Sequence, residues 1–324
     1  IESLFLELWA DEREEHIALR GPSRHVLRLV RRSPDGDARG RAEASADQPY
    51  RLEITTPGIF DNLTLRATSH REPAPGQVEI QVHAAGLNFR DVLKAMGMYP
   101  ADPDELMWLG DECAGKVVAV GEGVTDFEIG DDVIATAPAC FGRFATTPAP
   151  FVVRKPAHLS FEEAATIPVA FLTAHYALHH LGRLRRGERV LIHAAAGGVG
   201  LAAVQLAQRA GAEIFATAGS PAKREYLQSL GVEHVMDSRS LAFADEVLER
   251  TGGQGVDIVL NSLAGEFIPR SLSTLRANGR FLEIGKRDIY EHNRLDMSFL
   301  KNNVSFFAID LATVFKDQHA FSGE

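Results

Sequence analysis

A glycine-rich turn is the feature of this sequence with the clearest chemical use. The apolar residues Val190-Leu191-Ile192 run into His193-Ala194-Ala195-Ala196-Gly197-Gly198-Val199-Gly200, and helical periodicity follows as far as Gly211. Glycines let the backbone approach a phosphate closely, and the first turn of a helix offers free N–H groups at the positive end of its dipole. The turn departs from the G-x-G-x-x-G pattern because Ala195 stands first. We expect a pyrophosphate to be cradled by Ala196, Gly197, Gly198, Val199 and Gly200; the alternative is a tight turn that binds nothing.

The end of the next predicted strand indicates the type of dinucleotide. An NAD site usually holds the ribose 2′-hydroxyl with a carboxylate about 20 residues further on. Here the strand ends in Ala218-Gly219-Ser220 without an acid, and Lys223 and Arg224 follow in the first turn of the next helix. Nearby cations without a carboxylate suit a 2′-phosphate, so we predict NADPH, with Ser220 and Lys223 at this end of its site. The alternative is that both cations are ordinary solvated helix residues.

Several further segments resemble one enzyme family. They are Ala85–Val92 (AGLNFRDV), Gly97–Pro100 (GMYP), Thr166–Pro168 (TIP), Leu260–Gly265 (LNSLAG) and Phe281–Lys286 (FLEIGK). Together with the glycine turn, they resemble the enoylreductase domains of modular polyketide synthases and animal-type fatty acid synthase. These domains belong to the zinc-free, quinone-oxidoreductase side of the medium-chain dehydrogenase/reductase superfamily. The resemblance runs from about residue 50 to 310.

The resemblance implies a reaction. NADPH would reduce a trans-2-enoyl thioester, held by an acyl carrier protein domain, with hydride added to Cβ and a proton to Cα. The neighbouring domains of a multidomain synthase would be further partners. Two alternatives remain at this stage: a free-standing NADPH quinone or enone reductase, and a non-catalytic NADPH-binding domain.

The resemblance also implies catalytic residues. Lys286 follows a predicted strand at the edge where ligands sit in a doubly wound sheet, and it could stabilise the enolate or protonate Cα. Asp310 matches an acid facing the same cleft, which could hold Lys286 or give a proton itself. Tyr99 matches a tyrosine near the nicotinamide, whose presence goes with an S-configured α-methyl centre when the substrate is α-branched. The alternative for Lys286 and Asp310 is a strand-end ion pair with a structural task, and the alternative for Tyr99 is a packing residue with an exposed hydroxyl.

Other residues are implied at the cofactor. Asn88 matches an amide that holds the ribose or the nicotinamide, while Arg90 and Asp91 are expected to pair locally. Thr173 either contacts the nicotinamide or packs within its helix. His193 lies in an apolar strand, and we expect a hydrogen-bonded core histidine instead of a catalytic one. The remaining expected cofactor contacts are Asn261, Ser262 and Leu263 under the nicotinamide ribose, Gly285, and Arg239 near the adenosine phosphate.

A metal is not expected. The segment that carries a Gly-His-Glu in zinc alcohol dehydrogenases reads Gly110-Asp111-Glu112 here, without a histidine. The two cysteines, Cys113 and Cys140, have no His or Cys at ligand spacing. Two cysteines also exclude a disulfide framework and indicate a reducing, cytoplasmic compartment.

The elements that must position these residues follow two patterns. Residues 51–150 contain short β-rich runs, such as Arg51–Ile54, Val78–Ala84 and Lys116–Val120, separated by turn signals. After a helical segment at Phe161–Leu181, apolar strands alternate with helices, which predicts a parallel, doubly wound sheet. The expected elements are Arg189–Ala194, Val199–Ala210, Glu213–Ala218, Pro221–Leu230, His234–Met236, Leu241–Arg250, Val256–Asn261, Glu266–Arg276 and Arg280–Ile284.

The expected fold class is therefore α/β: a Rossmann sheet plus a β-rich, GroES-like substrate domain, as the resemblance implies. We expect an arm or linker over residues 1–50, with a polar loop at 31–48, and the substrate domain over 51–165. The NADPH-binding domain should span 166–310. The family continues with elements that return to the substrate domain, so 311–324 would be the start of that return. The chain begins without methionine, which suggests a piece of something longer.

Composition excludes several other classes. The 324 residues are 45% hydrophobic and 24% charged, and the formal net charge is −10. This balance is typical of a folded globular protein, and an acidic chain lacks the clustered positive charge that binds nucleic acid or an anionic membrane. The longest uncharged stretch, residues 190–208, contains three glycines, His193 and Gln205. It indicates a strand, a turn and a helix instead of a membrane span.

Overall fold

The computed structural model describes residues 17–20, 23–26, 48–69, 72–99 and 108–311. Its contacts divide the chain into two units, residues 1–41 and 42–324. In the first unit, β1 (Ile17–Arg20) and β2 (Ser23–Val26) form an antiparallel hairpin. The predicted polar loop at 31–48 and the predicted return segment at 311–324 lie almost wholly outside the described residues.

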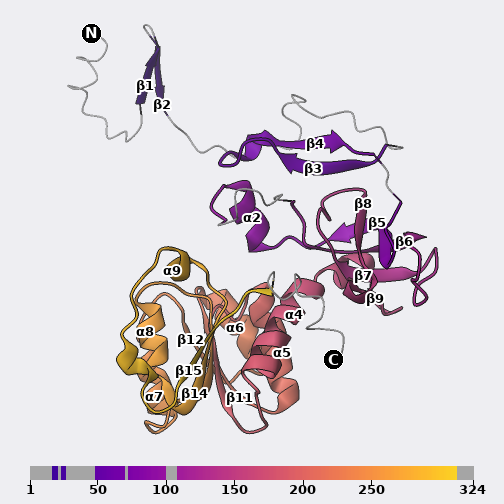
Figure 1. The fold of residues 1–324 in the computed structure, drawn as a ribbon. Coiled ribbons are helices and arrows are strands. Elements are labelled where there is room, and N and C mark those ends of the chain that lie inside the picture. Colours follow the sequence, from indigo (N-terminus) through magenta and orange to yellow (C-terminus); the bar gives the residue numbers. More distant parts are fainter. Residues whose placement is uncertain (1–16, 21–22, 27–47, 70–71, 100–107, 312–324) are drawn as a thin grey trace. The chain divides into compact units, whose positions relative to one another are not determined.

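A six-stranded parallel sheet forms the body of the second half of the chain (Figure 1). Its strand order is β12-β11-β10-β13-β14-β15, and every neighbouring pair is parallel. This arrangement confirms the predicted doubly wound sheet. The strands are β10 (Arg189–Ile192), β11 (Glu213–Ala218), β12 (His234–Asp237), β13 (Val256–Asn261), β14 (Leu275–Glu283) and β15 (Ser305–Ala308).

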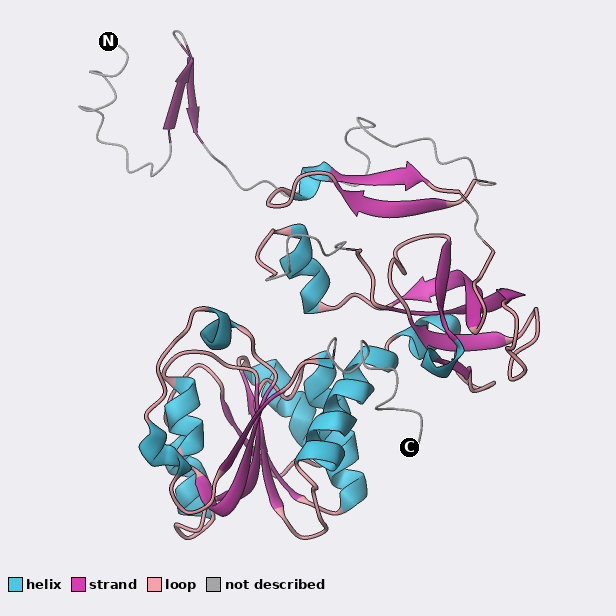
Figure 2. Cartoon of the chain, viewed as in Figure 1, coloured by secondary structure: helices cyan, strands magenta, loops and turns pink. Residues whose placement is uncertain are grey.

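Helices cover both faces of this sheet (Figure 2). One face packs against α4 (Pro168–His175), the π-helical turn η3 (Tyr176–Leu181), α5 (Gly198–Ala210) and α6 (Pro221–Ser229). The other face packs against α7 (Phe243–Arg250) and α8 (Phe267–Leu272). A parallel sheet covered on both faces requires strands that are apolar throughout, which is the pattern of this sequence.

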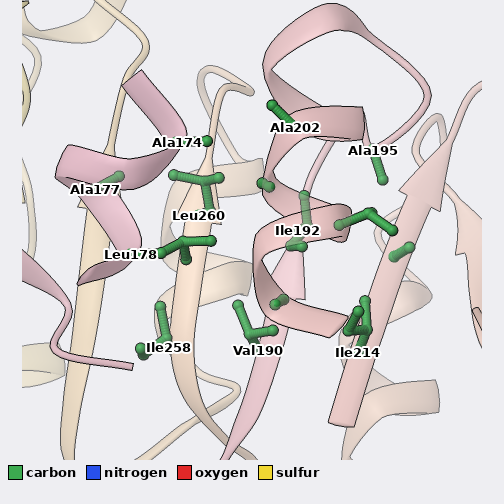
Figure 3. Packing of buried hydrophobic residues seen from close by; sticks show 14 of the residues in the cluster. Ala174, Ala177, Leu178, Val190, Ile192, Ala195, Ala202, Ile214, Ile258 and Leu260 are labelled. Atoms are coloured by element: carbon green, nitrogen blue, oxygen red, sulfur yellow. The ribbon is translucent and has the colours of Figure 1, made fainter. Parts of the chain in front are cut away.

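The core beneath α4 and α5 shows how the sheet is held (Figure 3). Side chains of β10 and β13, such as Ile192 and Leu260, are at most 2% exposed and face small helix residues such as Ala174 and Ala202. Burying one such aliphatic side chain contributes roughly 1.5–3 kcal/mol relative to leaving it in water. The alanines let both helices approach the strands closely, so the strand ends next to them are held in fixed positions.

The β-rich part forms a five-stranded antiparallel sheet in the order β8-β5-β6-β7-β9. Val78, Ile80 and Val133 lie in its core and are fully buried. Irregular pairing between β5 and β6 marks bulges, which bend a sheet. The strands are β5 (Gln77–Ala85), β6 (Glu112–Val120), β7 (Asp132–Thr136), β8 (Phe144–Pro148) and β9 (Val152–Arg154).

Smaller elements complete the chain. The hairpin of β3 (Tyr50–Ile54) and β4 (Leu63–Ala67) contains the short 3₁₀ turn η1 (Phe60–Asn62). Within the described residues, no helix is long and apolar enough to cross a membrane. The remaining short elements are α2 (Phe89–Ala95), η2 (Ala149–Phe151), α3 (Phe161–Ala165), α9 (Arg287–Tyr290) and η4 (Met297–Leu300).

Several predicted boundaries are wrong, and three of them have a clear physical reason. The helix expected over Phe161–Leu181 is three pieces, because Pro168 starts a new helix and the last turn is π-helical. The helix expected over Glu266–Arg276 ends at Leu272, since Leu275 already pairs with β13 as the first residue of β14. The strand predicted to reach Ala194 ends at Ile192, where the chain turns; Ala194 has a φ of 49°.

Candidate functional site

A cavity of about 1610 Å³ lies at the carboxyl ends of β10, β13, β14 and β15. Its walls include the residues that follow these four strands, and on the other side residues of α2 and of the antiparallel sheet. β10 and β13 are neighbours in the sheet although the chain crosses from one face to the other between them. In open α/β sheets, the crevice beside such a crossing point is where ligands bind.

The glycine turn lies in the wall of this cavity. Gly197 precedes the first turn of α5 in an extended conformation, and Gly197–Gly200 all line the cavity, whereas Ala196 does not. A Cβ on Gly200 would lie 2.5 Å from the carbonyl oxygen of Ala194, so this glycine allows the helix to pack on the strand end. A Cβ on Gly198 would meet no atom within 4 Å and would fill cavity space. These residues fit the pyrophosphate of a dinucleotide.

Lys286 and Asp310 meet at the cavity. The Nζ atom of Lys286 lies 2.8 Å from Oδ2 of Asp310 and donates a hydrogen bond to the carbonyl oxygen of Ile309 at 3.0 Å. Their side chains are 25% and 34% exposed, and both residues line the cavity. The pair is therefore held by the protein and is accessible to a bound molecule.

Tyr99 lines the same cavity and lies beneath a cation. The guanidinium carbon of Arg90 is 4.9 Å from the centroid of the Tyr99 ring, and Arg90 also pairs with Asp111 at 3.7 Å. Asp91 instead accepts hydrogen bonds from the backbone N–H groups of Gly110 and Asn88. Arg90 and Asp91 thus both pair within residues 88–111, as predicted, but with separate partners. A cation over an aromatic face is attractive and favours one orientation of the ring.

The amide of Asn88 is oriented by Glu112, a residue not predicted from the sequence to be functional. Asn88 Nδ2 donates to Glu112 Oε1 at 2.7 Å, and the N–H of Val169 at the start of α4 donates to Glu112 Oε2 at 2.7 Å. Burial raises the pKa of this carboxyl, against the hydrogen bonds from Val169 and Asn88, which lower it. Asn88 lines the cavity, and so does Thr173 of α4. A Cβ on Gly86 would meet the Glu112 side chain, so this contact exists only in the folded chain and could not be predicted from the sequence.

The loop after β13 is shaped by a residue that does not itself line the cavity. Asn261 is fully buried, and its Nδ2 donates to the carbonyl oxygen of Leu263 at 2.7 Å and to Glu283 Oε2 at 2.6 Å. Ser262, Leu263 and Gly285 line the cavity, as expected for cofactor contacts. Asn261 is therefore placed to hold the loop, whereas its neighbours are placed to meet a ligand.

The residues expected at the adenosine end lie outside the cavity wall, around the ends of β11 and β12. Ser220 starts α6 and accepts a long hydrogen bond, 3.4 Å, from the N–H of Lys223. Arg224 pairs at 3.4 Å with Asp237, whose carboxylate also accepts from the N–H of Arg239. A Cβ on Gly219 would lie 3.3 Å from Nε of Arg239, so this side chain reaches the end of β11. The carboxylate of Asp237 thus already has cationic and N–H partners.

His193 is a satisfied core residue, as predicted. It is 3% exposed, with Nδ1 3.0 Å from the hydroxyl of Thr217 and Nε2 2.8 Å from the hydroxyl of Ser271. Burial lowers its pKa to about 3, so the ring is neutral at physiological pH.

The residues near Asp111 do not fit a catalytic zinc. Asp111 pairs with Lys94 at 2.9 Å, and both oxygens of Glu112 accept hydrogen bonds from Asn88 and Val169. Cys113 and Cys140 are buried in the core of the antiparallel sheet. Across the described part of the chain, no three His, Cys, Asp or Glu side chains gather as a metal would require.

The comparisons with known proteins agree with this architecture. Residues 74–171 match the family of the alcohol dehydrogenase GroES-like domain, which supports the predicted GroES-like domain, and residues 198–321 match the zinc-binding dehydrogenase family. The chain is 47% identical, over 97% of its length, to a phenolphthiocerol/phthiocerol polyketide synthase of Mycobacterium tuberculosis. It is 44% identical, over 96% of its length, to the phthioceranic/hydroxyphthioceranic acid synthase of Mycobacterium bovis. The chain spans only 15% of the length of each of these relatives.

The chain is also similar to solved structures of single enzymes and domains. The CurK enoyl reductase is 49% identical, with a TM-score of 0.78 and 84% of each chain covered. The CurF ER cyclopropanase is 40% identical, with a TM-score of 0.76, covering 84% of this chain and 85% of that one. Mycobacterial Rv1454c, solved in complex with NADPH, is 30% identical with a TM-score of 0.74, covering 82% of this chain and 83% of that one. The chain therefore belongs to the enoyl reductase domains of polyketide synthases, which are oxidoreductases of the medium-chain dehydrogenase/reductase fold.

Proposed function

We propose that this domain uses NADPH to reduce a trans-2-enoyl thioester to the saturated acyl thioester. Residues 51–165 would serve as the substrate domain and residues 166–310 as the NADPH-binding domain. The observation that carries the proposal is that one cavity is lined by the glycine turn, Tyr99 and the Lys286–Asp310 pair. A cofactor cradle and polar groups able to donate a proton thus face the same space.

The chemistry requires donors at two atoms of the substrate. When bound, NADPH supplies a hydride to Cβ. Negative charge then develops on the thioester oxygen, and a positioned cation stabilises it in a site from which water is largely excluded. Lys286 is partly exposed to the cavity and held by Asp310 and the Ile309 carbonyl, so we assign it this role.

The proton for Cα has three candidate sources in the chain: Lys286, Asp310 and Tyr99. All three line the cavity, which supports their candidacy, since a general acid must lie within hydrogen-bond reach of the reacting atom. Arg90 over the Tyr99 ring would keep the phenol in one orientation. With an α-branched substrate, protonation from a fixed tyrosine would give one configuration, for which we expect the S centre.

The NADPH preference rests on the charges around β11 and β12. Asp237 is engaged by Arg224 and by the N–H of Arg239, and so is less available to a ribose 2′-hydroxyl. Lys223 lies in the first turn of α6, where the free N–H groups of a helix also favour an anion. Cations and an engaged carboxylate favour a 2′-phosphate over a 2′-hydroxyl.

The partner is proposed from the relatives. They are polyketide synthases of which this chain covers 15%, so the domain would work beside other synthase domains on chains carried by an acyl carrier protein. The cavity of about 1610 Å³ exceeds the roughly 300–1,000 Å³ typical of a pocket for one small ligand, which leaves room for an acyl group beside the nicotinamide end of the cofactor.

One assay tests the proposal. NADPH oxidation is followed with a crotonyl-pantetheine thioester and, in parallel, with a simple quinone. Turnover of the thioester alone supports an enoyl reductase. Turnover of the quinone alone would make the domain a quinone reductase, and NADPH binding without turnover of either would make it a binding domain.

A further inference from the structure

Glu283 is a buried acid in the cavity wall to which the proposed chemistry gives no role. It is the last residue of β14, three positions before Lys286, and is 2% exposed while still lining the cavity. A buried carboxyl needs hydrogen-bond partners to remain ionised, so its contacts indicate what it does.

The two oxygens of Glu283 bind two different loops. Oε2 accepts from Nδ2 of Asn261 at 2.6 Å, at the end of β13. Oε1 accepts from the N–H of Gly285 at 2.6 Å, in the loop that leads to Lys286. The same Asn261 amide holds the carbonyl of Leu263. One carboxylate thus joins the loop expected under the nicotinamide to the loop that carries the lysine.

A second acid holds the same two segments further along. The N–H of Gly265 donates to both carboxylate oxygens of Asp288 at 3.1 Å, and Asp288 is fixed by Nδ2 of Asn293. Lys286 therefore lies between two points, Glu283 and Asp288, at which its segment is tied to the Asn261–Gly265 loop. Asp288 is only partly buried, whereas Glu283 is 2% exposed, so the Glu283 contact is better shielded from water and is the stronger constraint.

We propose that Glu283 is a positioning residue: its carboxylate ties the Asn261–Gly265 loop to Gly285 and so sets the place of Lys286 relative to the bound nicotinamide. The inference rests on the proposed function, because it concerns the geometry of that reaction. The ionised form is the working form, since only a carboxylate offers two strong acceptors to the two N–H donors at once.

Near neutral pH, both the protonated and the ionised forms of Glu283 are populated. Burial raises its pKa to about 7, Asn261 and Gly285 lower it, and the nearby Asp288 raises it. Charged groups on the elements around it are engaged in ion pairs of their own: Lys286 with Asp310 and Arg287 with Glu291, and, on β14 and α8, Arg276 with Asp257, Arg280 with Glu188 and Arg270 with Asp245. Turnover should therefore rise with pH through about 7 as the carboxyl loses its proton.

The first test is Glu283→Gln, studied by steady-state kinetics with NADPH and crotonyl-pantetheine. Glutamine has the same shape but one acceptor, so one of the two loops loses its partner. We expect kcat to fall by about 10–100-fold, the cost of misplacing reacting groups by about 1 Å, with a smaller change in KM. The rise of kcat near pH 7 should disappear. An unchanged kcat and pH profile would overturn the proposal.

A matched control separates positioning from stability. Asp257 is a buried carboxylate in the neighbouring strand β13, paired with Arg276 away from the cavity. Asp257→Asn should destabilise the domain yet keep the pH profile of kcat. If Asp257→Asn removed the rise near pH 7 as well, that rise would not belong to Glu283.

A second measurement uses the unchanged protein and needs no turnover. The backbone amide proton of Gly285, followed by NMR, should titrate with a midpoint near 7, because its acceptor gains and loses a proton. A flat shift between about pH 6 and 8 would contradict the inference. A wild-type protein that fails to reduce the thioester would count against the proposed function alone, because this titration is independent of it.

Discussion

The ammonium of Lys286 and the carboxylate of Asp310 lie 2.8 Å apart, one beyond the end of β14 and the other beyond the end of β15. Glu283 and Ala308, the last residues of these strands, are register partners in a parallel pair. Because parallel strands end at the same edge of a sheet, the residues that follow the two strands by a few positions can meet there. The register of β14 and β15 thus brings Lys286 and Asp310 together in the wall of the cavity.

Replacing Lys286 by alanine should lower turnover of the thioester by roughly 10–1000-fold and leave NADPH affinity largely intact. The reason is that a donor to the thioester oxygen acts mainly in the transition state. Kinetics and fluorescence titration with NADPH provide the two readouts. Lys301→Ala, at an exposed lysine of the same region, is the control. Unchanged turnover in Lys286→Ala would remove this residue from the mechanism.

Replacing Lys223 by alanine should weaken NADPH binding by roughly 10-fold and NADH binding much less, as expected for one charge-assisted contact with a 2′-phosphate. Dissociation constants for both nucleotides give the answer. As a control, Arg209→Ala removes an exposed cation from the last turn of α5, and it should change the affinity for neither nucleotide. Equal losses for the two nucleotides would refute a contact with the phosphate.

Two glycines of the turn should respond differently to alanine. A Cβ on Gly200 would collide with Ala194 and Ala195, so Gly200→Ala should destabilise the domain by about 1–3 kcal/mol. A Cβ on Gly198 meets no protein atom within 4 Å, so Gly198→Ala should keep the melting temperature and lose nucleotide affinity. Thermal unfolding without nucleotide and NADPH titration distinguish these effects. A Gly198→Ala variant with normal affinity would contradict a pyrophosphate at this turn.

Glu283 should give stability a measurable pH dependence. Its pKa is raised from 4.5 to about 7, so between these values the folded state holds a proton that the unfolded state has lost. The contribution is fully present below pH 4.5 and is lost as pH rises through about 7, by up to roughly 3 kcal/mol. Denaturant unfolding of wild type and Glu283→Gln across this range measures it. Parallel curves for the two proteins would show that the carboxyl titrates normally.

His193 should act in the opposite direction. Its pKa falls from 6.5 to about 3 on burial, so between these values the unfolded state binds a proton that the folded state does not. Stability is therefore present above pH 6.5 and is lost as pH falls toward 3. His193→Gln should abolish this loss, as seen by unfolding at pH 4 to 7. If the variant lost stability in acid as steeply as wild type, the dependence would come from other groups.

The order of strands and helices in the cofactor domain could be predicted from the sequence because each element carries its own local signal. The strands are short apolar runs, and the glycine turn, the start of α6 at Pro221 and the end of α5 at Gly211 are local conformational requirements. Boundaries failed where pairing with a distant strand decided the state. Leu275 lies in β14 because Val256 is there to pair with it.

The residues of the candidate site also fall into those that could be predicted from the sequence and those that could not. Residues with a recognisable neighbourhood in the sequence, such as Tyr99 and Lys286, could be selected in advance and do line the cavity. Glu112 and Glu283 could not, because an acid after an apolar run does not show which distant amide it will meet. Their partners, Asn88 and Asn261, come from other elements and are brought to them only by the fold.

The sequence by itself determined the alternation of strands and helices, the glycine turn between a strand and a helix, and the family, since these depend on residue types at short spacing. The tertiary structure alone decided which charges are buried and which meet. It placed Arg90 over Tyr99, Asp310 beside Lys286 and Glu283 between two loops. The physical reason is that burial and charge pairing depend on distances between residues far apart in the chain, and these distances exist only once the sheet has formed.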